Sequence, residues 1–266
     1  MDILNEIGDS RLYNLHSHTQ YCDGRATMEE FVRSAIDMGF THYGFSPHSP
    51  VPIDSICNMN INNVPLYIAE YDRLKSIYSS QIKLYLSMEI DYLGNDWGPS
   101  HHYFDSIKLD YRIGSVHFIP NKTGKMIDVD GNFENFKKKM SLYFDNDIKY
   151  VVDTFYSQSK AMIEMGGFDI IGHFDKIGHN ASHYQSGIEN EKWYINHIDD
   201  MFDLIKSKNI IVEINTKAWE VHGRMFPNVN YFKRLKQENV PVIINSDAHF
   251  PHLINASREQ AFQLLK

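Results

Sequence analysis

The chain has 266 residues, of which 42% are hydrophobic and 23% charged, so it can bury a sizeable core as an ordinary globular protein. Its formal net charge is −8, with acidic and basic residues interspersed, which argues against the basic surface that sequence-independent nucleic-acid binding needs. No apolar run approaches the roughly 20 residues that cross a bilayer, so no membrane-spanning helix is expected.

In chain order, short apolar segments alternate with helical patterns. Thr27 and Glu30 have the spacing of a capping box and predict that a helix begins there. Segments rich in Ile, Val, Tyr and Phe, bounded by Gly, Pro, Asn or Asp, predict strands at 11–16, 41–46, 83–88, 112–117, 168–172, 210–214 and 241–245. Further helices are predicted near 63–79, 133–144, 146–165, 190–207, 229–238 and 256–265.

This alternation predicts an α/β fold with a parallel sheet and crossover helices. Such units can close into a barrel similar to the (β/α)₈ fold, or remain an open doubly wound sheet. Residues 92–110 and 118–132 are predicted loops, because Gly, Pro, Asn and Asp punctuate both, and 50–62 is irregular. Without a low-complexity segment or charge block, residues 1–266 are expected to form a single domain.

The cysteines and the N-terminal residues bear on the compartment. Cys22 and Cys57 lie outside any paired metal or redox motif, which favours a reducing interior over a disulfide framework. The first residues, MDILNEIGDS, lack the basic and apolar segments of a secretory signal. We therefore expect a cytoplasmic protein, while no coiled-coil pattern indicates an oligomeric state.

Imidazole and carboxylate side chains follow most of the predicted strands. The chain has 14 histidines, about twice the number expected from average composition. In parallel α/β folds the carboxyl ends of the strands form the functional face. The side chains that reach this face are predicted to be His16, His18, His48, Glu89, His117, His173, Asn215, Asp247 and His249.

The spacing of these residues favours a metal cluster. His16 and His18 lie two residues apart, so their side chains point to one side of an extended segment, and Asp247 and His249 repeat this geometry. Glu89 ends an apolar strand, where a carboxylate must be paired or metal-bound. Any one of these residues could simply be hydrogen-bonded, but together they predict a site for Zn, Fe or Mn.

The motifs H-S-H-T, S-P-H-S-P, M-E, S-V-H, G-H-F-D and S-D-A-H, in this order over residues 14–249, resemble the polymerase and histidinol phosphatase (PHP) superfamily, and within it the histidinol-phosphate phosphatases. The resemblance implies a distorted (β/α)₇ barrel with two to three divalent metals. It implies that Glu89 bridges a first metal, held with His16, His18 and Asp247, to a second metal. The second metal would also bind His117 and His173, and a third would bind His48 and His249. Many relatives have a further histidine after the first motif, and Asp23 is its best substitute here.

The resemblance also implies a small-molecule phosphate ester as substrate, and three residues are candidates for binding the phosphate. They are Lys176 and His179, which follow His173, and Arg224 in the loop after the sixth strand. Arginine suits a bidentate phosphate contact. For each of these residues the alternative is a solvated loop side chain.

The resemblance further implies hydrolysis of L-histidinol phosphate to L-histidinol and phosphate in histidine biosynthesis. Bridged metals roughly 3.5–4 Å apart would supply a hydroxide nucleophile, and Asp247 or His249 would supply a proton to the leaving group. One alternative is the same chemistry on a nucleotide, a sugar phosphate or a phosphotyrosine. Another is a non-catalytic metal-binding module, which would be expected to have lost ligands.

Overall fold

The computed structural model describes residues 3–266, and its centre is a sheet of seven strands. The strands follow the order β1-β2-β3-β4-β7-β8-β9, and every neighbouring pair is parallel. They are β1 (Tyr13–Asn14), β2 (His42–Phe45), β3 (Lys83–Asp91), β4 (Tyr111–Ser115), β7 (Ile170–Ile171), β8 (Ile211–Asn215) and β9 (Val242–Asn245). The predicted α/β class and parallel pairing are therefore confirmed.

The edge strands β1 and β9 meet, so the sheet closes into a barrel. Ser17 and Ala248 form a parallel bridge, and the backbone N–H of His18 donates to the carbonyl of Ala248 at 2.9 Å. The side-chain oxygen of Asn245 accepts a hydrogen bond from the N–H of Leu15, also at 2.9 Å. The first and last strands are therefore joined by one β-bridge and side-chain hydrogen bonds, not by a continuous row of backbone hydrogen bonds, and the barrel is distorted at this point. Of the two architectures compatible with the sequence, the distorted (β/α)₇ barrel is the one that forms.

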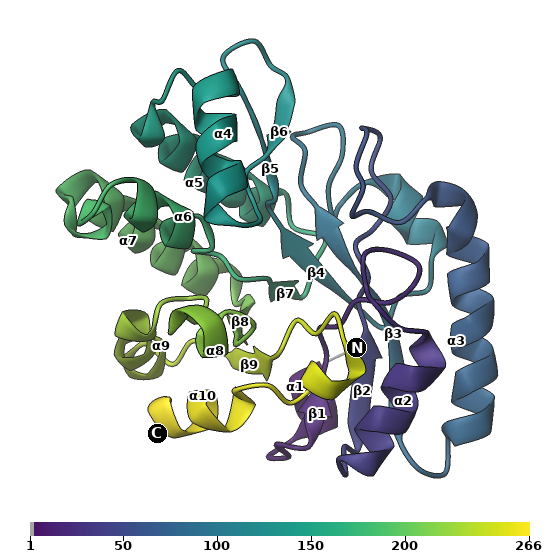
Figure 1. The fold of residues 1–266 in the computed structure, drawn as a ribbon. Coiled ribbons are helices and arrows are strands. Elements are labelled where there is room, and N and C mark those ends of the chain that lie inside the picture. Colours follow the sequence, from purple (N-terminus) through teal and green to yellow (C-terminus); the bar gives the residue numbers. More distant parts are fainter. Residues whose placement is uncertain (1–2) are drawn as a thin grey trace.

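Helices surround the barrel (Figure 1). The first long helix begins as predicted, because the Thr27 hydroxyl accepts from the N–H of Glu30 while the Glu30 carboxylate accepts from the N–H of Thr27. In chain order the helices are α1 (Ile3–Ile7), α2 (Met28–Asp37), α3 (Val64–Tyr78), α4 (Phe133–Tyr143), α5 (Ile148–Met165), α6 (Ile177–Tyr184), α7 (Lys192–Lys208), α8 (Trp219–His222), α9 (Phe232–Gln237) and α10 (Arg258–Leu264). No helix within residues 3–266 is long and apolar enough to cross a membrane.

Side chains fill the barrel interior. Tyr111 of β4 crosses to the first strand, where its hydroxyl donates to the carbonyl of Leu15. Gly44 of β2 makes room for this contact, since a Cβ atom there would lie 2.0 Å from the Tyr111 hydroxyl. Ile3 and Ile7 of α1 are buried in the same apolar cluster. Functional groups are therefore confined to the strand ends and the loops beyond them.

Several predicted boundaries were wrong. Residues 118–132 were predicted as a loop, but β5 (Phe118–Pro120) and β6 (Met126–Asp128) form an antiparallel hairpin, seen beside α4 in Figure 1. The loop 92–110 contains a 3-10 helix at His102–Ser106, and α1, α6 and α8 were not predicted. These elements are too short for a periodic apolar pattern to identify them.

Candidate metal centre

The predicted metal ligands come together at the carboxyl ends of the strands. Glu89 belongs to β3 itself, whereas the histidines and aspartates lie in the loops that follow the strands. Positive backbone φ angles of 24° at His173 and 49° at Asp247 bend the chain out of β7 and β9 toward this centre. The residues that meet here are His16, His18, Asp23, His48, Glu89, His117, His173, Asp247 and His249.

Glu89 occupies the middle of the cluster and is 1% exposed. Its Oε2 lies 3.3 Å from Nε2 of His16 and 3.1 Å from Nδ1 of His48. Its Oε1 lies 2.9 Å from Nε2 of His173 and 3.4 Å from Nε2 of His117. Because the two carboxylate oxygens face different imidazoles, the geometry suits a carboxylate that bridges two cations.

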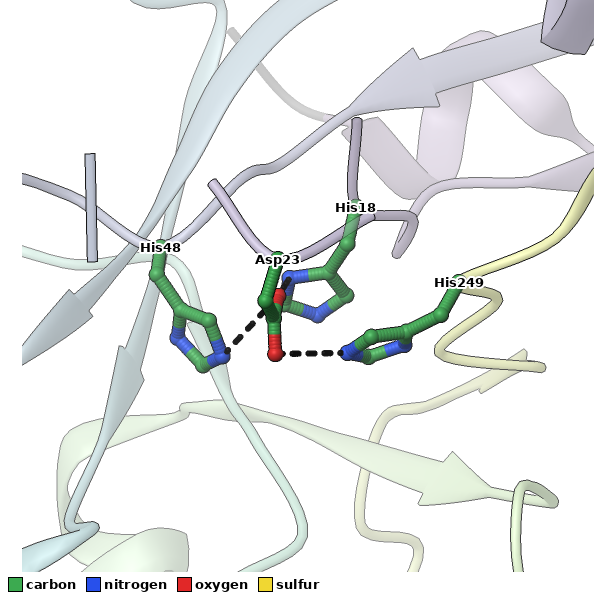
Figure 2. Close-up of side chains that lie close together, drawn as sticks. All are labelled: His18, Asp23, His48 and His249. Atoms are coloured by element: carbon green, nitrogen blue, oxygen red, sulfur yellow. Dashed lines mark ion pairs between the residues drawn. The ribbon is translucent and has the colours of Figure 1, made fainter. Parts of the chain in front are cut away.

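Asp23 lies among the imidazoles of His18, His48 and His249, as Figure 2 shows. Its Oδ1 is 3.5 Å from Nδ1 of His18 and 3.9 Å from Nε2 of His48, and its Oδ2 is 3.3 Å from Nε2 of His249. One potential ligand atom from each of these four residues lies within 4.8 Å of the others. The first-motif loop therefore places a carboxylate where it could complete a third site.

The donor set fits divalent metals. Within residues 3–266, the buried atoms His16 Nε2, His18 Nε2, His48 Nδ1 and Asp23 Oδ1 have no hydrogen-bond partner. Leaving buried polar atoms unpaired costs about 1–3 kcal/mol each, unless another partner such as a cation takes the hydrogen bond's place. Neutral imidazole nitrogens and carboxylate oxygens are ligands that Zn, Fe and Mn accept. Ligand atoms also lie within 4.8 Å of one another in two further buried groups. One group is His16, His18 and Asp247, and the other is His48, Glu89 and His117.

The centre opens into a cavity of about 680 Å³, lined by Lys176 but not by Arg224 or His179. The Arg224 guanidinium is bound by both carboxylate oxygens of Glu189, at 2.8 and 2.9 Å, and by Asp175 at 3.0 Å. His179 packs instead against other imidazole rings of α6 and α8. Of the predicted phosphate ligands, the structure places only Lys176 beside the centre.

The PHP domain family model matches residues 14–217. The chain belongs to this family. A probable histidinol-phosphatase from Deinococcus radiodurans is 24% identical over 247 residues, which cover 90% of this chain and 87% of the relative. A histidinol-phosphatase from Bacillus subtilis is 22% identical over 258 residues, covering 88% and 92% of the two chains.

Solved structures of PHP proteins share the fold. HisK from Listeria monocytogenes superposes with a TM-score of 0.81 at 18% identity, covering 93% of this chain and 99% of the other. A histidinol phosphate phosphatase from Lactococcus lactis, complexed with Zn, L-histidinol and phosphate, gives a TM-score of 0.67 at 16% identity and covers 95% and 92%. The distorted barrel is thus the architecture of this PHP domain.

Carboxylates behind the ligands orient two of the imidazoles, and the sequence analysis missed them. Nδ1 of His16 lies 2.6 Å from Glu213, and Nδ1 of His117 lies 2.7 Å from Asp91. Each bond fixes the ring so that Nε2 faces the centre, as is usual for metal-binding histidines. A signal was available for Asp91, because it follows Glu89 by two residues in the same strand. Glu213 could have been noticed as a carboxylate inside the apolar strand β8.

Lys217 is another residue that the sequence analysis did not select. It lies beyond β8, lines the cavity, and places Nζ 3.3 Å from Oδ1 of Asp247 and 3.4 Å from Nε2 of His249. Its signal was weak, since a lysine in a loop is usually solvated. Its ammonium and that of Lys176 bring positive charge to the cavity lining.

Burial and neighbouring charges shift the pKa values of the ligands in opposite directions. Burial alone would lower the pKa of His16, but the carboxylates of Glu213, Glu89 and Asp247 raise it well above its ordinary value. For His18, burial dominates and lowers the pKa well below its ordinary value. Metal binding requires neutral imidazoles, so protons and metals compete for this centre, and His16 is the stronger proton acceptor of the pair.

Proposed function

We propose that this PHP protein hydrolyses L-histidinol phosphate to L-histidinol and inorganic phosphate. The observation that carries the proposal is the buried ligand set around Glu89, which opens into a cavity lined by Lys176 and Lys217. The relatives that share most of the chain's length and are named histidinol-phosphatases support the choice of substrate. So does the fold shared with the Lactococcus lactis phosphatase, whose structure holds Zn, L-histidinol and phosphate.

Two to three divalent transition metals, Zn, Fe or Mn, would bind the ligand set. We assign His16, His18, Glu89 and Asp247 to the first metal. Glu89, His117 and His173 would hold the second metal, and His48, His249 and Asp23 the third. When bound, such metals supply a nucleophile at neutral pH and offset the charge of the phosphoryl group.

The chain's own residues bind and orient the ester. Lys176 and Lys217 line the cavity and would receive the non-bridging phosphate oxygens. Asp247 and His249 line the same cavity and are the candidates to give a proton to the leaving alkoxide oxygen. We assign Arg224 a structural role instead, because Asp175 and Glu189 occupy both of its terminal guanidinium nitrogens and the side chain does not line the cavity.

The proposed partner is a small phosphate ester. We also propose that the reaction takes place in the cytoplasm, in keeping with the free thiols of Cys22 and Cys57.

The deciding experiment measures phosphate release by metal-loaded protein from L-histidinol phosphate, beside nucleotide, sugar and tyrosine phosphates. We expect kcat/KM to be highest for L-histidinol phosphate. Activity confined to another ester would keep the phosphatase centre and reject the substrate. Absence of turnover on every ester, with metals bound, would favour a non-catalytic metal-binding role.

A further inference from the structure

The β5–β6 hairpin lies outside the barrel and forms one wall of the active-site cavity. Phe118 of β5, Asp128 of β6, and Asp130 and Gly131 just beyond β6 all line this space. Part of the 50–62 segment also lines the cavity, including Ile56, which is 100% exposed. The hairpin therefore meets the part of a substrate that extends away from the metal centre.

The register of the hairpin fixes which side chains face the cavity. Ile127 and Val129 are buried in the apolar core, at 5% and 4% exposure. Successive side chains of an extended segment point to opposite sides, so Asp128 and Asp130 point into the cavity. The N–H of Val129 donates to the carbonyl of His117 at 2.9 Å, which ties this wall to a residue of the metal centre.

Asp130 combines a lysine contact with a free carboxylate oxygen. Its Oδ2 lies 2.7 Å from Nζ of Lys176, a candidate phosphate ligand. Its Oδ1 has no hydrogen-bond or ion-pair partner among residues 3–266, and the side chain is 32% exposed. Both oxygens of Asp128, in contrast, are used: they accept from the N–H of Asp130 and from Lys139, each at 2.8 Å. A cation next to a Lys176-bound phosphate would thus find an acceptor at Asp130.

Phe118 adds an apolar face to the same wall. It is 7% exposed and lines the cavity, so a flat ring of the ligand could pack against it. The cavity lining therefore combines the paired Lys176 ammonium and Asp130 carboxylate with the aromatic ring of Phe118. L-Histidinol phosphate carries a phosphate, an ammonium on the carbon next to the ester carbon, and an imidazole ring.

We propose that the β5–β6 hairpin determines substrate specificity, with Asp130 receiving the ammonium of the ester and Phe118 packing against its ring. This inference rests on the proposed function for the identity of the substrate. Whether the protein recognises an amine beside a phosphate can be tested without knowing which ester is its natural substrate.

The test compares the wild-type protein with Asp130→Asn on two matched pairs of esters. One pair is L-histidinol phosphate and its analogue without the amino group, and the other is 2-aminoethyl phosphate and ethyl phosphate. Loss of a charge-assisted hydrogen bond predicts a fall of about tenfold or more in the ratio of kcat/KM, amine over amine-free, in both pairs. The ratio cancels any effect that the substitution has on both esters through Lys176. Asp145→Asn, at a position 81% exposed and away from the cavity, is the matched control and should leave the ratio unchanged.

The outcomes separate this inference from the proposed function. If Asp130→Asn lowers kcat/KM equally for both members of each pair, Asp130 only positions Lys176 and the inference is wrong. If L-histidinol phosphate is not hydrolysed, the proposed function fails, and the aminoethyl pair still decides the role of Asp130. Should the variant not fold, the inhibition constants of L-histidinol and of its analogue without the amino group are compared on the wild-type protein instead. Equal inhibition by the two alcohols would overturn the proposal, and a preference of about tenfold for the amine would support it.

Discussion

Replacement of Glu89 by glutamine tests the role of the central carboxylate most directly. The substitution keeps the shape of the side chain but removes its charge and turns one acceptor atom into a donor. In the structure the two oxygens lie 2.9 Å from His173 and 3.1 Å from His48, so the amide nitrogen would face an imidazole nitrogen on one side or the other. The variant should therefore bind metals less tightly and lose activity.

The size of the effect follows from the missing charge. A unit charge about 4 Å from another contributes about 4 kcal/mol at an effective dielectric constant of 20. Because 1.4 kcal/mol corresponds to a factor of ten, we expect Glu89→Gln to lower kcat/KM by about 10³-fold. A bridging carboxylate faces two cations, so at least one metal per chain should be lost as well.

The assay combines phosphate release with the metal content of the same sample, measured by inductively coupled plasma mass spectrometry. Glu164→Gln, on the exposed surface of α5, is the matched control and should behave as the wild type. A Glu89→Gln protein with its full metal content and activity within tenfold of the wild type would refute the bridging role.

Three further predictions follow from the surroundings of the centre. Glu213→Gln should weaken metal binding by about 10–100-fold, measured by competition with a chelator, because it loosens the ring of His16. Arg224→Ala should lower the free energy of unfolding by about 3 kcal/mol in urea titrations, because buried Asp175 loses its positively charged partner and keeps only the hydrogen bond from the N–H of Asn228. A large rise in KM in this variant would instead support a phosphate-binding role for Arg224. Burial lowers the pKa of His179 to about 4, so the stability contributed by its neutral form is complete above pH 6.5 and lost as the pH falls toward 4. His179→Gln should flatten the pH dependence of the unfolding midpoint in that window, and an unchanged slope would contradict the assignment.

Local patterns predicted the main architecture well. Strand–helix alternation gave the parallel sheet, and the Thr27–Glu30 spacing gave the start of α2, since both depend on residues close together in the chain. The β5–β6 hairpin was missed because its strands have only three residues each and its polar turn, which contains Asn121 and Gly124, resembles a loop. Its stability comes from burial of Ile119 and Ile127 against helices distant in sequence, which no local pattern records.

The substrate side of the site shows the limit of reading residues by type. Arg224 is chemically suited to phosphate, yet its guanidinium forms ion pairs with Asp175 and Glu189 instead. Lys217 has no motif that distinguishes it from a solvated lysine, but the parallel pairing of β8 with β9 brings it beside Asp247. Whether a lysine or arginine side chain is free to bind phosphate depends on which carboxylates lie near it, and these carboxylates come from other loops.

The sequence by itself determined the parallel α/β fold and the residue types that gather at the strand ends, because a strand's apolar pattern and its last residue are local properties. Only the tertiary structure decided that the sheet closes, that the two oxygens of Glu89 face separate histidine groups, and that the hairpin places Asp130 beside Lys176. These are distances between atoms far apart in the chain, and they are set by the packing of the whole barrel.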